Sequence, residues 1–237
     1  MMNLYEAIGC RHSVRKYTDR EVTEKLRGQI LSYFDKTSRL NDRIRVEAGI
    51  LDNTKKKADV HGLWKVDAPY YLAIYSDQEE GCERNAGYLM EQMVLYMTAK
   101  GLGTCYLGSV QPAQKVRGGK RCLMMVAFGY PEGKLYRESP LAKRLPLNEL
   151  CIFKEEAGEQ MKTILRAARL APTAMDTQAL HRLFRPNLCV RPKNPLSGQE
   201  LPCDARIQHR HHALPHYARR RRTMDGTSDG DGGTFCG

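Results

Sequence analysis

The sequence predicts a domain of mixed helices and strands, either α+β or α/β. Apolar residues recur at helical spacing in Ala86–Met97 and again in Glu155–Leu170. Short apolar runs that suit strands lie at Ala68–Tyr75, Thr104–Leu107 and Arg121–Phe128. Because the two kinds of pattern alternate along the chain, we expect helices to pack against a sheet.

Two short helices are expected near the N-terminus, at Asn3–Cys10 and Glu21–Phe34. The second opens with acidic residues at the positive end of its dipole. The following stretch, Arg39–His61, is polar and charge-rich with weak periodicity, and we interpret it as an excursion or a hairpin. The strand predicted at Ala68–Tyr75 comes next.

The clearest helix pattern follows that strand and stops at Gly101. Its apolar positions are Ala86, Leu89, Met90, Met93, Val94 and Met97. A stripe of methionines at this spacing is typical of a core rather than of a cofactor contact. We therefore expect this helix to be central to the packing.

The second half of the pattern is less regular. The strand at Thr104–Leu107 lies between glycines, and a short helix is predicted near Pro112–Val116. The strand at Arg121–Phe128 ends at a Gly-Tyr-Pro sequence, and a basic loop spans 134–144. An amphipathic helix is then expected at Glu155–Leu170.

Composition limits the class of protein. The 237 residues are 41% hydrophobic, which is enough for a core, and no apolar run reaches the length of a membrane span. The N-terminal sequence lacks the pattern of a secretory signal. The eight cysteines form no Cys-x-x-Cys pair, so we expect reduced thiols in a cytoplasmic protein, with no zinc site or disulfide framework.

The net charge of +11 does not indicate one basic surface. Residues 1–178 carry a net charge of +6, and residues 179–237 carry +5 on a third of that length. This tail holds an Arg219–Arg222 run and keeps no helix or strand period. Nucleic-acid binding by such an arm is the last of the alternatives, because it lacks interleaved aromatic residues.

Two origins are open for residues 179–237, a disordered tail or a frameshifted translation. Met224-Asp225 must be encoded ATG-GAY, and a one-base shift would read tryptophan there. In the shifted reading frame, the codons of the preceding arginines could encode an alanine-rich helical sequence. The tail also holds residue types that bind metals, without a recognised spacing, so no metal site is expected; they are Cys203, His209, His211, His212 and His216.

The segment Arg11–Tyr17 reads Arg-His-Ser-Val-Arg-Lys-Tyr. Guanidinium groups make bidentate, charge-assisted bonds to phosphate oxygens. In an extended segment the alternate spacing places Arg11, Ser13 and Arg15 on one side. The segment is therefore a candidate grip for a phosphate monoester, although a basic run can also be a solvated face.

Four motifs in this order resemble the FMN-dependent nitroreductase family. They are Arg-His-Ser-Val-Arg-Lys-Tyr at 11–17, Gly-Leu-Gly-Thr-Cys-Tyr-Leu-Gly at 101–108, Phe-Gly-Tyr-Pro at 128–131 and Ala-Arg-Leu-Ala-Pro-Thr-Ala-Met-Asp-Thr-Gln at 168–178. The resemblance implies an α+β, three-layer fold with a central, mainly antiparallel sheet flanked by helices. It also implies FMN as the cofactor and NAD(P)H as the electron donor.

The resemblance assigns cofactor contacts residue by residue. The first motif would hold the FMN phosphate and ribityl chain through Arg11, His12, Ser13 and Arg15. The backbone of Tyr106, Leu107 and Gly108 would lie against the isoalloxazine, since glycines allow close approach. Lys143 and Arg144 would add a second phosphate contact.

The order of the motifs is similar to a double-repeat subfamily, the TM nitroreductases. It implies a first half at 1–150, the start of a second half at 151–178 and a truncation thereafter. The second half would supply, within the same chain, the wall of the flavin site that a partner subunit supplies in other family members. Its residues there would be Pro172, Thr173, Ala174 and Asp176. The resemblance implies a monomeric pseudo-dimer or a homodimer. Thr173 stands where the family has Ser, Asp176 stands where it has Asn, and the Pro-Trp expected after Gln178 is absent.

The implied activity is reduction of nitroaromatic, quinone-like or other small electrophilic acceptors by flavin hydride transfer. No general acid or base is assigned, because the chemistry is the flavin's. His12 fits a cofactor contact or a structural role, and Cys105 fits core packing better than redox chemistry. The alternative is a flavin- or nucleotide-binding protein without turnover, or an inactive truncated homologue.

Overall fold

The computed structural model describes residues 2–55, 58–63, 65–138, 142–153, 158–173 and 188–190, with only the backbone described at 151–153 and 188–190. These residues belong to one unit, Met1–Leu201. The predictions for Ala174 and Asp176 lie outside the described residues, as does the tail apart from residues 188–190, which form a short strand that the sequence pattern did not predict. No described helix is long and apolar enough to cross a membrane.

The first two helices begin at side-chain caps. Helix α1 (Leu4–Cys10) opens with a capping box, in which the Asn3 side chain accepts from the Glu6 amide and Glu6 accepts from the Asn3 amide. Helix α2 (Glu24–Phe34) begins three residues later than predicted. The reason is Thr23, whose hydroxyl accepts a hydrogen bond from the Leu26 amide at 3.3 Å and fixes the first turn.

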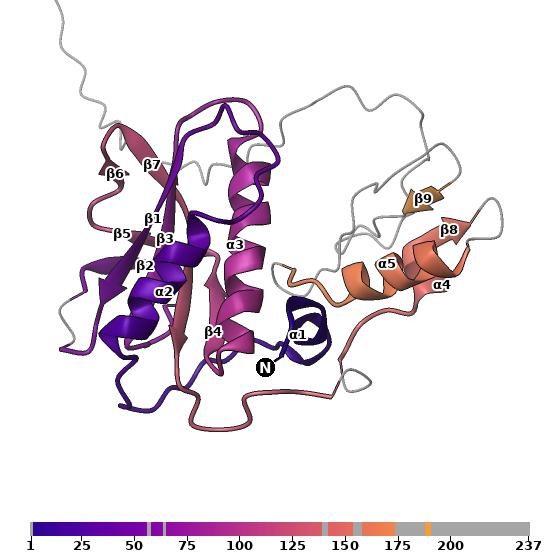
Figure 1. Ribbon diagram of the computed structural model, residues 1–237, viewed down its shortest axis with the longest axis horizontal. Helices are drawn as coiled ribbons and strands as arrows, with labels where there is room; N and C mark the ends of the chain where they lie inside the picture. The colour runs from indigo at the N-terminus through magenta and orange to yellow at the C-terminus, as the bar shows by residue number, and fades with distance from the viewer. Residues whose placement is uncertain are drawn as a thin grey trace, which may run out of the picture. The chain divides into compact units, whose positions relative to one another are not determined.

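The central sheet is antiparallel throughout and has the order β1-β3-β7-β4 (Figure 1). These strands are Val46–Asp52, Tyr70–Ser76, Lys120–Gly129 and Gly103–Leu107. The two-residue strand β6 (Val116–Arg117) pairs with the start of β7. The expected α+β fold with a central antiparallel sheet is confirmed.

Two sequence predictions were wrong in detail. The stretch 39–61 was expected to be an excursion or a hairpin, but it holds β1 and the start of β2 (Val60–Leu63), which pair with β3 and β5 and not with each other. The helix predicted near Pro112–Val116 is absent, since Pro112 ends strand β5 (Ser109–Pro112) and Val116 begins β6. Strand β5 pairs with β2, about fifty residues earlier, and local periodicity carries no information about such a partner.

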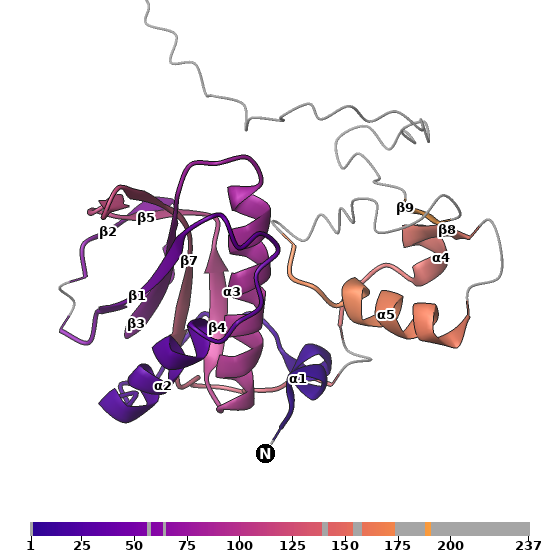
Figure 2. The ribbon, with the colours of Figure 1, turned by 45° about the horizontal axis from the view of Figure 1, so that its top comes forward.

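The sheet is buried on both faces, which explains why every residue of β3 is buried. Helix α3 (Cys82–Ala99) packs on one face with α2, and the β2–β5 pair lies over the other (Figures 1 and 2). The predicted methionine core of α3 is confirmed, with Met90, Met93 and Met97 fully buried. The residues of β3 alternate between the faces, with Tyr70, Leu72 and Ile74 toward α3.

The C-terminal described elements form a smaller cluster. They are α4 (Leu147–Leu150), β8 (Cys151–Phe153), α5 (Glu159–Arg169) and β9 (Leu188–Val190), with β8 and β9 antiparallel. Leu150 and Leu165 are buried together between α4 and α5. Helix α5 begins at Glu159, four residues after the predicted start.

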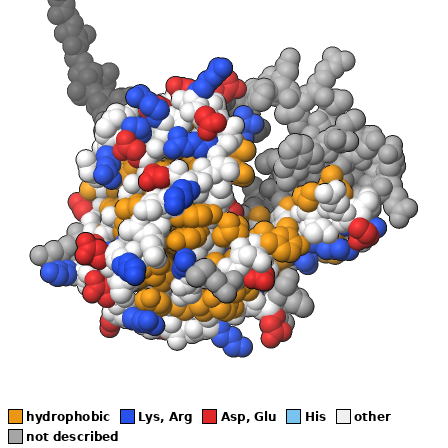
Figure 3. Space-filling model, in the orientation of Figure 1, with side chains coloured by type: hydrophobic (Ala, Val, Ile, Leu, Met, Phe, Trp, Pro, Cys, Tyr) orange, Lys and Arg blue, Asp and Glu red, His pale blue; other side chains and the backbone are white. Residues whose placement is uncertain are grey.

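Apolar side chains also remain on the described surface. Figure 3 shows hydrophobic groups over the region of α3, between Lys and Arg side chains. Tyr5 on α1 is 62% exposed and Tyr88 on α3 is 41% exposed.

Candidate functional site

The basic segment Arg11–Tyr17 lies along one edge of the sheet, beside β4. The Val14 amide donates to the Thr104 carbonyl at 2.8 Å, and Ser13 forms a parallel bridge with Thr104. The Val14 side chain occupies the space next to Gly103, where a Cβ atom would lie 2.7 Å from Val14 Cγ2. A glycine at 103 therefore allows the segment to approach the strand closely.

The other side of the segment is held by residues 130–137. Four polar contacts run along it: Thr18 N to Tyr130 O at 2.8 Å, Glu132 N to Lys16 O at 3.2 Å, His12 Nε2 to Lys134 O at 2.9 Å and Arg137 N to Cys10 O at 2.9 Å. The His12 ring is thus bound to a backbone carbonyl. With β4 on one side and this chain on the other, the segment has little freedom to move.

Two side chains anchor the segment in the core. Val14 and Tyr17 are buried, and the Tyr17 hydroxyl donates to the Val14 carbonyl at 2.7 Å and to the Ala127 carbonyl at 3.3 Å. Burial raises the pKa of Tyr17, so this hydroxyl stays a donor. Arg15 and Lys16, which lie between these two anchors, are exposed.

Arg11, Ser13 and Arg15 each act electrostatically on the Cys105 thiol. Burial raises the pKa of the Cys105 thiol, and the Arg15 charge, the Ser13 hydroxyl and the Arg11 charge each act in the opposite direction. All three groups therefore lie within electrostatic reach of Cys105. The thiol itself is 4% exposed and packs with Val14 and Leu107, as expected of a core residue.

Arg11 and Arg137 carry guanidinium nitrogens that lack partners. Arg11 is 3% exposed, and its Nη1 is buried without a hydrogen bond, as are Nε and Nη2 of Arg137. Burial lowers the pKa of Arg137, and the charges of Arg11, Arg144 and Arg169 lower it further. Within the described ranges, neither Arg11 nor Arg137 has an ion-pair partner.

A cluster of cations of this kind is costly without an anion, because unpaired buried charges lose their solvation. A phosphate dianion has oxygen acceptors that suit several guanidinium donors. The donor set therefore fits the phosphate of FMN. Arg137 and Arg169 were missed by sequence reasoning, although the basic loop 134–144 and the motif at 168–178 contained them.

The predicted phosphate contacts Lys143 and Arg144 have different environments. Lys143 is exposed, whereas Arg144 donates to the Lys143 carbonyl at 3.1 Å and to the Ala171 carbonyl at 3.2 Å. Arg169 donates in return to the Leu145 carbonyl at 2.7 Å. These bonds attach 143–145 to the end of α5, directly before Pro172 and Thr173.

Strand β4 and the glycine that follows it would contact a ligand through their backbone rather than through side chains. Leu107 is buried in the core, and a Cβ at Gly108 would meet nothing within 4 Å, so the chain is open there. The Tyr106 side chain points to the α3 side, where its hydroxyl donates to Glu91 Oε2 at 2.7 Å. Only the backbone of Tyr106 is left for a contact with a flavin.

A hollow of about 430 Å³ opens beside the segment and is basic in character. Its wall includes His12, Ser13, Arg15 and Lys16 on one side and residues 131–134 on the other. Arg15, Lys16 and Lys134 contribute positive charge, against Glu132.

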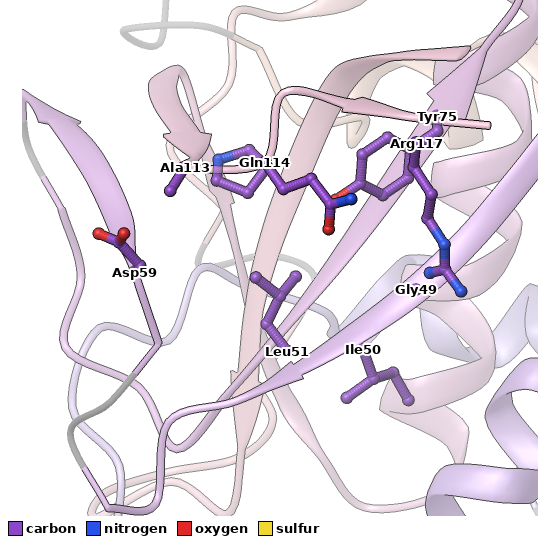
Figure 4. A pocket seen from close by; sticks show the side chains of 9 residues that line it. Gly49, Ile50, Leu51, Asp59, Tyr75, Ala113, Gln114 and Arg117 are labelled. Carbon is purple, nitrogen blue, oxygen red and sulfur yellow. The ribbon is translucent and has the colours of Figure 1, made fainter. Parts of the chain in front are cut away.

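A second cavity, of about 310 Å³, shares no residue with this site. It lies on the β2–β5 side of the sheet, between β1 and the chain that joins β5 to β6 (Figure 4). Gly49 forms part of its wall, and a Cβ there would lie 2.7 Å from Arg117 Nη1. It therefore stands apart from the residues predicted by the sequence.

The close approach at Gly103 yields a stability prediction. Gly103→Ala should lower the free energy of unfolding by about 1–3 kcal/mol, because the stiff Val14 side chain cannot give way. Chemical denaturation measures the change. Gly28→Ala, whose Cβ would meet nothing within 4 Å, is the matched control and should not destabilise. Equal effects of the two variants would contradict the close packing.

The buried cations yield a second prediction, on anion binding. Arg137→Gln should raise the free energy of unfolding of the anion-free protein by about 1 kcal/mol, because it removes a cation beside Arg11. Inorganic phosphate should stabilise the parent protein more than the variant. Thermal unfolding with and without phosphate measures both, and Arg43→Gln, an exposed cation, is the control. Equal stabilisation of all three proteins by phosphate would exclude Arg137 from the anion site.

Comparison with known proteins bears on the fold and the family of this chain. A profile of the family described as "Putative TM nitroreductase" matches residues 3–184. A "putative nitroreductase" from Thermotoga maritima MSB8 is 22% identical, with a TM-score of 0.53 over 82% of this chain and 77% of that chain. A nitroreductase family protein from Clostridium difficile 630 is 19% identical, with a TM-score of 0.51 over 63% and 96% of the respective chains.

A third solved structure, an FMN-dependent nitroreductase from Clostridium difficile R20291, is 16% identical with a TM-score of 0.48, over 60% of this chain and 97% of that chain. A search of curated proteins gave no match. At these identities the solved structures show the fold alone. The family profile covers well over half of the chain, and the chain therefore belongs to the nitroreductase family that this profile describes.

Proposed function

We propose that this protein binds FMN and acts as an NAD(P)H-dependent oxidoreductase toward small electrophilic acceptors, such as nitroaromatic or quinone-like compounds. Members of the nitroreductase family are oxidoreductases. The observation that carries the proposal for this chain is the group of buried guanidinium nitrogens on Arg11 and Arg137 that lack partners. Buried, charged donors of this kind are stabilised by an anion that accepts their hydrogen bonds, and a flavin phosphate is such an anion.

Different residues of the site would bind different parts of the cofactor. Arg11 and Arg137 would bind phosphate oxygens, with the charges of Arg144 and Arg169 close by. Ser13 offers a hydroxyl beside Arg15 in the basic hollow, which suits a polar chain that leads away from the phosphate. The open backbone at Gly108 would then allow a flat ring to approach.

The bound flavin would supply the redox chemistry, by accepting hydride from NAD(P)H and passing electrons to the acceptor. The protein's part is to bind, to orient and to hold charge. Positive charge from Arg11, Arg15 and Arg137 stabilises the anionic cofactor in its place. The second wall, Pro172–Asp176, stays a prediction, since the described residues end at Thr173 in this region.

Flavin binding is tested first. Purified protein mixed with FMN should show the flavin absorbance bands after gel filtration, and Arg11→Gln should reduce the affinity for FMN by about 10-fold or more, the usual cost of losing one charged hydrogen-bond donor. Arg43→Gln should bind like the parent protein. A colourless parent protein that takes up no FMN would refute the cofactor assignment.

Turnover is tested separately, since binding without turnover is the alternative function. The FMN-loaded protein should oxidise NADH or NADPH, and a nitroaromatic or quinone should accelerate the oxidation. Loss of NAD(P)H oxidation in the Arg11→Gln variant at limiting FMN, restored by excess FMN, would support a binding role for Arg11. Tight FMN binding with no acceptor-stimulated oxidation would leave the protein as a flavin-binding module.

A further inference from the structure

The second cavity, on the β2–β5 side of the sheet, has no part in the proposed flavin site. Strand β1 borders it with Gly49 and Leu51, and β3 borders it with the Tyr75 ring. The chain 112–117 forms the other side (Figure 4). Its volume of about 310 Å³ is at the lower limit of cavities that hold small molecules, and it suits a ligand with a single ring.

The chain on that other side is fixed by backbone hydrogen bonds. The Ala113 amide donates to the carbonyl of Asp59, the residue directly before β2, at 2.8 Å. The Cys122 amide of β7 donates to the Lys115 carbonyl at 2.8 Å, and β6 then pairs with the start of β7. This side of the cavity is therefore part of the folded framework.

Arg117 brings a guanidinium group to the cavity. Its Nη1 lies so close to Gly49 that a Cβ atom there would be 2.7 Å away, and Cε2 of the Tyr75 ring would lie 3.8 Å from the same Cβ. The cation and the ring thus meet over a residue that has no side chain. Of the described residues, none forms an ion pair or a hydrogen bond with the Arg117 side chain. Glu47, on the same strand as the glycine, is paired with Lys120.

Two further polar groups of the cavity have no hydrogen-bond partner in the part of the chain that the structure describes. One is the hydroxyl of Tyr75, whose residue is 4% exposed overall. Burial raises the pKa of this tyrosine, so the hydroxyl stays protonated and can donate. The other is the amide of Gln114, which lies between Asp59 and Arg117 in Figure 4.

The two ends of the cavity carry opposite charge. Asp59 lies at the end away from Arg117, where its carboxylate contacts the His61 ring (Figure 4). Apolar groups of Leu51, Pro112 and Ala113 contribute to the walls. A dianion would meet only one guanidinium and would also face the Asp59 charge, whereas a monoanion with an apolar body complements both ends.

We propose that this cavity binds a small organic monocarboxylate that has a single flat ring. The carboxylate would bind to the Arg117 guanidinium, whose planar pair of donors matches two carboxylate oxygens, with the Tyr75 hydroxyl as a further donor. The ring would lie against Leu51 and the Gln114 side chain. The site is independent of FMN binding, because the two sites share no residue.

Benzoate is the probe, and a ligand-observed NMR titration of the 237-residue chain gives its Kd. We expect a Kd of about 1 mM or lower. Benzamide, which keeps the ring and lacks the charge, should bind at least about 10-fold more weakly, and Arg117→Gln should weaken benzoate binding by a similar factor. Lys115→Gln is the matched control, since it removes an exposed cation of the same chain that does not line the cavity, and it should bind benzoate like the parent protein.

Gly49→Ala tests the same contact without removing the cation. The added Cβ would meet the flexible end of Arg117 and displace it, at little cost to folding. Benzoate binding should weaken by about threefold or more, because a displaced guanidinium loses its hydrogen-bond geometry. This variant also covers the case in which Arg117→Gln fails to fold.

Several outcomes would overturn the carboxylate site. These are equal benzoate affinity in the parent protein and in Arg117→Gln, equal affinity for benzoate and benzamide, and no saturation by about 10 mM benzoate. Inorganic phosphate that displaces benzoate at equal concentration would overturn the choice of a monocarboxylate. Loss of benzoate binding in Arg137→Gln would place the anion at the candidate flavin site and would also overturn the proposal. A protein that binds benzoate as expected but takes up no FMN would refute the proposed function alone.

Discussion

The double-sided docking of residues 11–18 determines the geometry of the whole candidate site. Backbone bonds to Thr104 on one side and to residues 130–137 on the other hold this segment extended. Val14 and Tyr17 fill the core, so the side chains between them must face outward. The path of the 130–137 chain also brings Arg137 alongside Arg11, and the site arises from this one arrangement of backbone.

The same arrangement creates an electrostatic problem that a ligand would solve. Arg11 and Arg137 are held close together with buried nitrogens that lack partners, and the charges of Arg144 and Arg169 add to the cluster. Buried charges are stable only when they are compensated. A bound phosphate would supply that compensation, so binding and folding would be linked through Arg11.

The sequence predicted those features of the fold and of the site that depend on residues close together in the chain. The methionine stripe of α3 and the apolar runs of β3 and β7 are local patterns, and they identified the core correctly. Strands β1, β2 and β5 escaped, because they are short or mix polar residues and glycine with their apolar residues, so no local apolar pattern marks them. Spacing alone grouped Arg11 with Ser13 and Arg15, whereas Arg137 matters only through burial and tertiary neighbours that no local pattern contains.

The most direct measurement is a crystal structure of the protein soaked or co-crystallised with FMN. We predict phosphate oxygens within hydrogen-bond distance of Arg11 Nη1 and of the Arg137 guanidinium. A flavin whose phosphate lies elsewhere, with Arg11 and Arg137 still lacking an anionic partner, would contradict it.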